Sequence, residues 1–224
     1  MTQRLTPEQA AELLHPTDVL GIPLGPGHPG AFLHALGPRR DWEDLVITGA
    51  LLTDFYEVFG QPGVRFLSGF YGPLERLMRD QGGAIDFVPA DFRRFGPALE
   101  RIHPRVLATA AAPPDADGWC SLSLHAGATI KELERAGADP GRVLVVEVSP
   151  RFPTTQGLGE HRHRLHVDQI DVLIESDREP FVIGDPEPSD DERAIAAFVD
   201  DYVVDGATIQ TGIGGVPSTV RNWA

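Results

Sequence analysis

The pattern of the whole chain is visible in residues 18–30, which read DVLGIPLGPGHPG. An apolar run of strand length passes into a loop rich in glycine and proline, and residues 31–36 then have helical character. A strand, a turn and a helix in this order form the repeating unit of α/β proteins. Such proteins often bind ligands at a strand-to-helix loop, although a plain connection would use the same residue types.

The same pattern continues along most of the chain. Thr6 is expected to cap a first helix, with Pro7 in its first turn and Gln9 closing a capping box. Further strand candidates are 45–51, 64–70, 85–89, 105–111, 143–148 and 172–175, and further helix candidates are 74–79, 97–102, 128–136 and 190–203. Short apolar strands alternating with helices predict an α/β fold, with a largely parallel sheet flanked by helices.

The composition excludes several classes of protein. The formal net charge is −14, which disfavours binding to nucleic acid and to anionic membranes. No apolar run approaches the roughly 18 residues of a membrane span, and the N-terminus lacks the pattern of a signal peptide. Cys120 is the single cysteine, so neither an internal disulfide nor a cysteine-built metal site can form. These features predict a cytoplasmic protein, and anionic ligands remain possible because backbone N–H groups can bind them.

One change of composition divides the chain. Residues 185–192 read DPEPSDDE, which is typical of a linker followed by the start of a helix. We expect a first domain over 1–186, and over 187–224 a linker and the start of an incomplete second domain. This second part should hold a helix, a strand over Ala207–Ile209 and a glycine-rich loop.

The glycine-rich loop reads GIGGVP and covers residues 212–217. It is not a dinucleotide fingerprint, because Pro217 stands where a third glycine would be needed, and no Gly-Lys-Ser/Thr follows as in a P-loop. Closely spaced glycines let a backbone approach a ligand and present free N–H groups to it. A ligand-binding loop and a tight turn without a ligand are both compatible with the spacing.

Residues 161–166, HRHRLH, suggest a metal site, because His161 and His163 would share one face of a strand. The interleaved arginines oppose a cation, and a solvated basic stretch is the favoured interpretation.

Residues 119–125, WCSLSLH, combine a thiol, hydroxyls and a histidine without the context of a known nucleophile. Alternation predicts a half-buried strand, with Cys120, Leu122 and Leu124 inward. The carboxylates Glu57 and Glu75 have no motif around them and are interpreted as surface or structural residues.

Three ordered motifs resemble the acetyl-CoA hydrolase/CoA-transferase family, which includes acetate, succinyl and 4-hydroxybutyrate CoA-transferases. Residues 117–123 (DGWCSLS) are similar to the family's DG-aromatic-x-S-L segment, and residues 145–157 (VVEVSPRFPTTQG) to its EVN…P…G segment. Residues 205–217 (DGATIQTGIGGVP) are similar to its DGATLQ-x-GIG-x-(V/I)P motif. The resemblance covers essentially the whole chain, but only about the first half of a typical family member.

The resemblance implies a CoA-transferase-like fold and acyl-CoA:carboxylate CoA transfer, or acyl-CoA hydrolysis if water replaces the acceptor. Coenzyme A would enter as a substrate together with a small carboxylate, without a metal. A glutamate would attack the acyl-CoA thioester, and CoA would then form a thioester with that glutamate. In the family, the glycine-rich loop contacts CoA. The resemblance implies that the corresponding contacts here are Gly212, Ile213, Gly214, Gly215 and Val216, and that the N–H of Val216 helps to form the oxyanion hole.

The chain also departs from the family pattern. The nucleophilic glutamate follows the glycine loop in an H-(T/S)-E segment, which these 224 residues do not contain. Ser149 stands in place of the usual Asn, and Gln156 in place of a common His. The polypeptide by itself is therefore expected to be inactive.

Three interpretations of that inactivity stay open. The chain could be a truncated, inactive remnant, a CoA-binding module, or one half of a split enzyme whose complementary chain carries the glutamate. A homodimer, which is common in the family, is compatible with each. A remnant should expose the apolar side chains of residues 195 and 197–199, which a second domain would normally cover.

Overall fold

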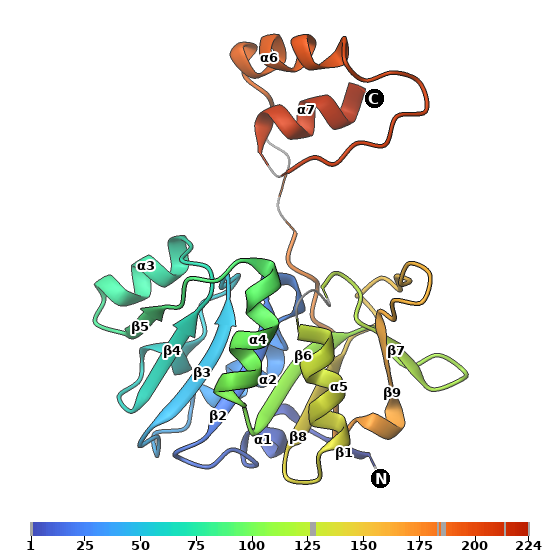
Figure 1. Cartoon of the computed structure of the whole chain (residues 1–224). Coiled ribbons are helices and arrows are strands. Elements are labelled where there is room, and N and C mark those ends of the chain that lie inside the picture. Colours follow the sequence, from blue (N-terminus) through green and yellow to red (C-terminus); the bar gives the residue numbers. More distant parts are fainter. Residues whose placement is uncertain (1, 126–128, 183, 185–186, 213, 224) are drawn as a thin grey trace. The chain divides into compact units, whose positions relative to one another are not determined.

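The computed structural model describes residues 2–125, 129–182, 184, 187–212 and 214–223 (Figure 1). The chain divides into two compact units, residues 1–181 and 182–224. The predicted boundary at Pro186 lies outside the described residues. Among the described residues, no helix is both long and apolar enough to cross a membrane.

A parallel sheet forms the centre of the first unit (Figure 1). Its spatial order is β1-β10-β8-β6-β2-β3-β4-β5, and every neighbouring pair is parallel. The strands are β1 (Gln3–Leu5), β2 (Val19–Leu24), β3 (Leu45–Ala50), β4 (Val64–Ser68), β5 (Ala84–Phe87), β6 (Val106–Ala111), β8 (Val143–Val148) and β10 (Val172–Glu175). The predicted α/β fold class is confirmed.

Helices cover both faces of this sheet, with α4 and α5 on one face and α1 and α2 on the other (Figure 1). The helices of the first unit are α1 (Pro7–Ala11), α2 (Gly30–Leu36), α3 (Pro73–Asp80), α4 (Phe92–Ile102) and α5 (Ile130–Ala138). Thr6 caps α1 in the predicted capping box with Gln9. The two layers of helices explain why the strands are apolar on both faces.

The core is divided by the sheet into two layers, and β8 shows the division most clearly. Leu144, Val146 and Val148 pack with residues of α5, whereas Val145 packs with residues of α1 and α2. Successive side chains of a strand point to opposite faces, so Glu147 faces the same side as Val145. A buried carboxylate is thereby directed toward α2.

A two-stranded antiparallel sheet, β7 (Trp119–Ser121) with β9 (Arg164–His166), stands beside the parallel sheet. The predicted alternation over 119–125 holds for Cys120 and Leu122, which are buried. It is wrong for Ser121 and beyond Leu122, because Ser121 and Ser123 are buried and Leu124 is exposed. Ser123 has a positive φ of 55°, so the chain leaves the extended conformation there and the period of two is lost.

The second unit contains two helices, α6 (Asp190–Asp200) and α7 (Gly215–Trp223), which contact each other. The strand predicted over Ala207–Ile209 is wrong, because these residues have no regular secondary structure. A β-branched run becomes a strand only beside a partner strand, and the described residues provide none there. The predicted exposure of apolar residues on α6 is observed, with Phe198 75% and Ile195 50% exposed.

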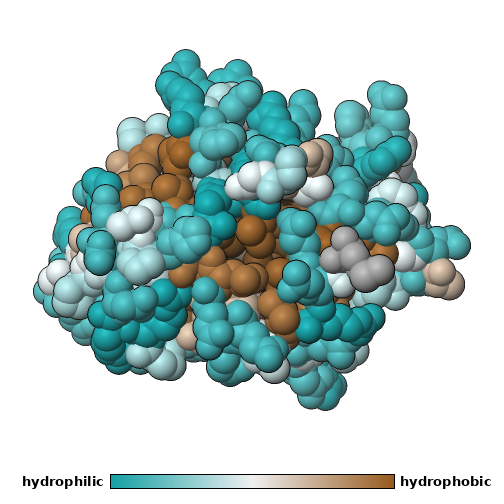
Figure 2. Space-filling model, turned by 90° about the horizontal axis from the view of Figure 1, so that it is seen from below, coloured by the Kyte–Doolittle hydropathy of each residue, from teal (hydrophilic) through white to brown (hydrophobic). Residues whose placement is uncertain are grey.

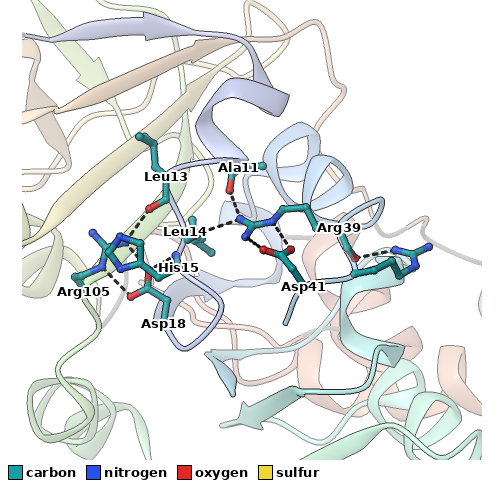
Figure 3. A network of polar contacts seen from close by, with 9 residues as sticks. Ala11, Leu13, Leu14, His15, Asp18, Arg39, Asp41 and Arg105 are labelled. Atoms are coloured by element: carbon teal, nitrogen blue, oxygen red, sulfur yellow. Dashed lines mark hydrogen bonds and ion pairs between the residues drawn. The ribbon is translucent and has the colours of Figure 1, made fainter. Parts of the chain in front are cut away.

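On the side where strands β2, β3 and β6 begin, the first unit is largely hydrophilic around a central apolar area (Figure 2). A network of polar contacts ties the segment between α1 and β2 to the start of β6 (Figure 3). Asp18 accepts hydrogen bonds from the Nε of Arg105 at 2.8 Å and from the backbone N–H of His15 at 2.9 Å. Arg105 also donates to the carbonyl of Leu13, and Arg39 to the carbonyls of Ala11 and Leu14.

Asp18→Asn should lower the free energy of unfolding by about 2 kcal/mol at neutral pH, because it weakens buried, charge-assisted hydrogen bonds. Burial raises the pKa of Asp18, but the hydrogen bonds from Arg105 and the backbone outweigh it and hold the pKa below its ordinary value of 3.8. Stability from a lowered carboxyl pKa is present above the unfolded-state value and is lost as the pH falls through the folded-state value. Urea unfolding at several pH values should therefore show the difference between wild type and variant disappear in acid. Asp41→Asn, which removes an exposed carboxylate beside Arg39, is the control and should change stability less.

Candidate functional site

A cavity of about 180 Å³ opens at the edge of the sheet where the parallel strands end. It lies in the first unit, where the segments after β2, β3, β8 and β10 converge. Its lining residues are Gly25, Pro26, His28, Gly30, Thr53, Asp54, Tyr56, Glu147, Phe152, Arg178, Glu179 and Phe181. In doubly covered parallel sheets this carboxyl edge is where ligands usually bind.

Among the described residues that line this cavity, Arg178 is the only arginine or lysine. Its guanidinium lies 3.0 Å from the carboxylate of Asp54, which also lies 3.0 Å from Nε2 of His34. Burial raises the pKa of Asp54, but hydrogen bonds from His34, from the N–H of Phe55 and from Arg178 lower it overall. A Cβ on Gly30 would come within 2.3 Å of the Nε of Arg178, so glycine is needed for the guanidinium to lie against the start of α2.

Glu147 is a buried residue of the same cavity wall and joins three segments of the fold. One carboxylate oxygen accepts from the N–H of Phe32 at 3.1 Å, and the other from the hydroxyl of Ser176 at 2.8 Å. The N–H of Phe32 belongs to the first turn of α2, where a negative charge is favoured by the helix dipole. Glu147 therefore fixes the start of α2 relative to β8 and to the segment after β10.

Ser149 positions the backbone of Arg178. Its hydroxyl donates to the Arg178 carbonyl at 2.8 Å and accepts from the N–H of Arg151 at 3.2 Å. Ser149, which stands where the resembling proteins usually have Asn, thus fixes the backbone from which the Arg178 side chain extends to the cavity.

Two aromatic side chains of the wall are uncharged at neutral pH. Burial, with a contribution from His125, lowers the pKa of His28 to about 4, although the backbone of Pro23 and Ala50 acts in the opposite direction. Burial and the nearby Asp54 raise the pKa of Tyr56. The cavity therefore holds one permanent cation, three carboxylates and neutral rings.

The predicted CoA loop lies in the second unit. Val216 is the second residue of α7, so its N–H has no carbonyl acceptor within the helix. Gly214 has a φ of 135°, and a Cβ on Gly215 would meet the carboxylate of Glu192. Gly212 is exposed, and Ile213 lies outside the described residues. The role assigned to these residues stays a prediction.

The other candidate residues have structural partners. His163 contacts the carbonyl of Ser123 through Nε2 at 2.7 Å. Both His161 and His163 precede β9, so the prediction that they share one face of a strand is wrong. No group of three or more possible ligands among the described residues is arranged to hold a metal ion. Burial, with a contribution from Asp115, raises the pKa of the Cys120 thiol to about 11, which suppresses the reactive thiolate at neutral pH.

Glu57 and Glu75 differ from each other. Glu57 is exposed and pairs with Arg40. Glu75 is fully buried and accepts hydrogen bonds from the N–H groups of Leu52 and Gly72. Of the two roles predicted for these residues, Glu57 has the surface role and Glu75 the structural one.

The fold and the position of the cavity define an α/β protein with a cavity at the carboxyl edge of a doubly covered sheet. No protein-family model matches the chain. It is 29% identical over 219 residues to the succinyl-CoA:cyclohexane-1-carboxylate CoA transferase of Geobacter metallireducens, covering 96% of this chain and 48% of that protein. It is 28% identical over 141 residues to the 4-hydroxybutyrate coenzyme A transferase of Clostridium kluyveri, covering 62% of this chain and 30% of that protein.

Solved structures give the same relationship for the fold. RipA from Yersinia pestis superposes with a TM-score of 0.87 at 23% identity, covering 99% of this chain and 53% of RipA. The 4-hydroxybutyrate CoA-transferase abfT-2 from Porphyromonas gingivalis gives 0.69 at 21% identity, covering 98% of this chain and 50% of that protein. The resemblance to CoA-transferases is confirmed. The chain spans about half the length of the first of these relatives, the Geobacter enzyme.

Proposed function

We propose that the chain forms part of an enzyme that transfers coenzyme A between an acyl-CoA and a small carboxylate. The observation that carries the proposal is the cavity at the carboxyl edge, with Arg178 held against Gly30, in a chain similar to several CoA-transferases. In this proposal the first unit binds the carboxylate through the guanidinium of Arg178. A guanidinium is suited to a carboxylate because it can donate two parallel hydrogen bonds.

The finer chemistry is also a proposal. The N–H of Val216 would stabilise the oxyanion that forms when the thioester is attacked, and the glycines before it would let CoA approach the backbone. The attacking group would be a glutamate in an H-(T/S)-E segment, which these 224 residues lack. The proposal also includes hydrolysis as an alternative to transfer, a substrate of the acetate type, and a complementary chain that carries the glutamate.

The 224-residue polypeptide by itself is expected to transfer no CoA from acetyl-CoA to propionate or succinate. The assay is chromatographic detection of propionyl-CoA or succinyl-CoA after incubation with the purified chain. Formation of either product above the rate without protein would contradict the assignment of the nucleophile to a segment that the chain does not contain.

Carboxylate binding by the first unit can be tested separately from turnover. Arg178→Gln should weaken the binding of propionate, followed by NMR titration of the full chain, about tenfold, because a charge-assisted pair is lost. Asp54→Asn should strengthen it, because the Asp54 carboxylate competes for the same guanidinium. Arg65→Gln, at an exposed arginine on β4, is the matched control. Equal propionate affinity in wild type and Arg178→Gln would remove Arg178 from the site.

A further inference from the structure

A second cavity, of about 330 Å³, lies beside the β7–β9 sheet and shares no lining residue with the first. Its walls are the residues around β7, namely Pro113, Asp115, Trp119 and Ser121, and the segment that leads into β9, namely residues 154–157, 159 and 161–164. The segment 161–166 is the basic stretch for which the sequence offered a metal as one interpretation. The CoA-transfer proposal uses none of these side chains.

Two arginines of this cavity are held over an aromatic ring. The guanidinium of Arg164 lies 4.3 Å from the centre of the Trp119 ring, and that of Arg162 lies 5.8 Å from it. The ring of His166 packs against Trp119 edge-on, with the ring centres 4.9 Å apart. Stacking on an aromatic face orients a guanidinium while leaving its N–H groups free to donate.

These two guanidiniums have no carboxylate partner in the part of the chain that the structure describes. Among the described residues, neither Arg162 nor Arg164 forms an ion pair, although acidic side chains outnumber basic ones 33 to 19. The carboxylate in the wall is that of Asp115, whose Oδ1 accepts from the N–H groups of Asp117 and Trp119, at 3.0 and 2.8 Å. This carboxylate therefore pairs with backbone N–H groups of the turn before β7 and not with either arginine.

The floor of the cavity is fixed by a hydrogen-bond network. The hydroxyl of Ser121 donates to the Thr155 carbonyl at 2.8 Å, and the hydroxyl of Thr155 donates to the Ser123 carbonyl at 2.7 Å. His163 contacts the same Ser123 carbonyl. The strand β7 and the segment 154–164 are therefore joined by side chains as well as by the β7–β9 ladder, which fixes the walls from which the arginines project.

We propose that this cavity binds the phosphate groups of a small phosphorylated ligand. Two guanidiniums that line one cavity and lie against one ring match the charge and the hydrogen-bond geometry of a phosphate or diphosphate better than those of a single carboxylate. A volume of about 330 Å³ is in the range of small-molecule sites. The overall charge of −14 opposes a nucleic acid, whose many phosphates would meet the rest of the surface. The inference does not depend on CoA transfer.

The test is titration of the full chain with pyrophosphate, followed by calorimetry and by tryptophan fluorescence. Wild type should bind saturably, and the R162Q/R164Q double variant should bind at least about tenfold more weakly, because each lost guanidinium removes charge-assisted hydrogen bonds. The matched control is R65Q/R101Q, which removes the same charge from exposed positions on β4 and α4 and should bind as wild type does. Circular dichroism verifies that all three proteins are folded.

Two sources of the phosphate are distinguished by a competition arm with CoA. If CoA displaces pyrophosphate and is itself bound more weakly by R162Q/R164Q, the cavity accepts the phosphates of CoA. If CoA does not displace pyrophosphate, the ligand is a separate phosphorylated compound, and the site is still supported. Absence of saturable pyrophosphate binding below about 10 mM, or equal weakening in R162Q/R164Q and R65Q/R101Q, would overturn the proposal.

Discussion

Glu75→Ala should lower the free energy of unfolding by about 4 kcal/mol, although Glu75 is distant in sequence from every motif of the chain. The carboxylate is fully buried and accepts from the N–H of Leu52 at 2.8 Å and from the N–H of Gly72 at 3.0 Å. The hydroxyl of Ser68 lies 3.4 Å from the same group. It thus holds together the segment after β3, the end of β4 and the start of α3. Removing it leaves two backbone donors without an acceptor and a space where the side chain was.

The measurement is urea unfolding of the full chain followed by tryptophan fluorescence, since Trp42 is in the core of the first unit. Glu57→Ala is the matched control, because Glu57 is an exposed glutamate paired with Arg40 and should contribute less than about 1 kcal/mol. Glu75→Gln should fall between the two, because the amide keeps only one of the two accepting oxygens. Similar unfolding curves for Glu75→Ala and Glu57→Ala would contradict the structural role.

The strands that the sequence predicted best are those buried on both faces. The apolar runs Val143–Val148 and Val172–Glu175 coincide with β8 and β10, because a strand between two helical layers is apolar at most positions and so gives a nearly continuous apolar run. The three-residue strands β1 and β9 were not predicted. Gln3–Leu5 and Arg164–His166 have polar residues at most positions, and their extended conformation follows from pairing with β10 and β7.

The candidate site was predicted only in part for the same reason. The glycine-rich loop after β2 gave a local signal, and the cavity is formed there. The contact between Asp54 and Arg178 spans 124 residues and has no local signal, since it requires β3 and β10 to end on the same edge of the sheet. An apolar strand with one acid near its end, as at Glu147, is the only sequence feature that could have indicated the buried carboxylate.

The ion pair between Glu132 and Arg142 should give the second large effect. Glu132 on α5 and Arg142 before β8 are both buried, and their charged groups lie 2.7 Å apart. Arg142 also donates from Nε to the Pro104 carbonyl at 2.8 Å, which connects α5, β8 and the turn before β6. Taking two charges out of water is costly, so the pair adds little net stability, but breaking it leaves one charge buried without its partner.

Glu132→Met should therefore lower the free energy of unfolding by about 3–5 kcal/mol, and the double variant Glu132→Met/Arg142→Met should recover most of that loss. The two single variants should differ. After Arg142→Met, Glu132 still lies 3.1 Å from the half-exposed Arg135, whereas after Glu132→Met, Arg142 keeps only a carbonyl. Glu132→Met should thus be the more destabilising of the two. In thermal unfolding, the midpoint temperature should fall by roughly 2–4 °C for each kcal/mol of stability lost. The four proteins form a double-mutant cycle, and additive single effects would show that the buried charges do not act as a pair.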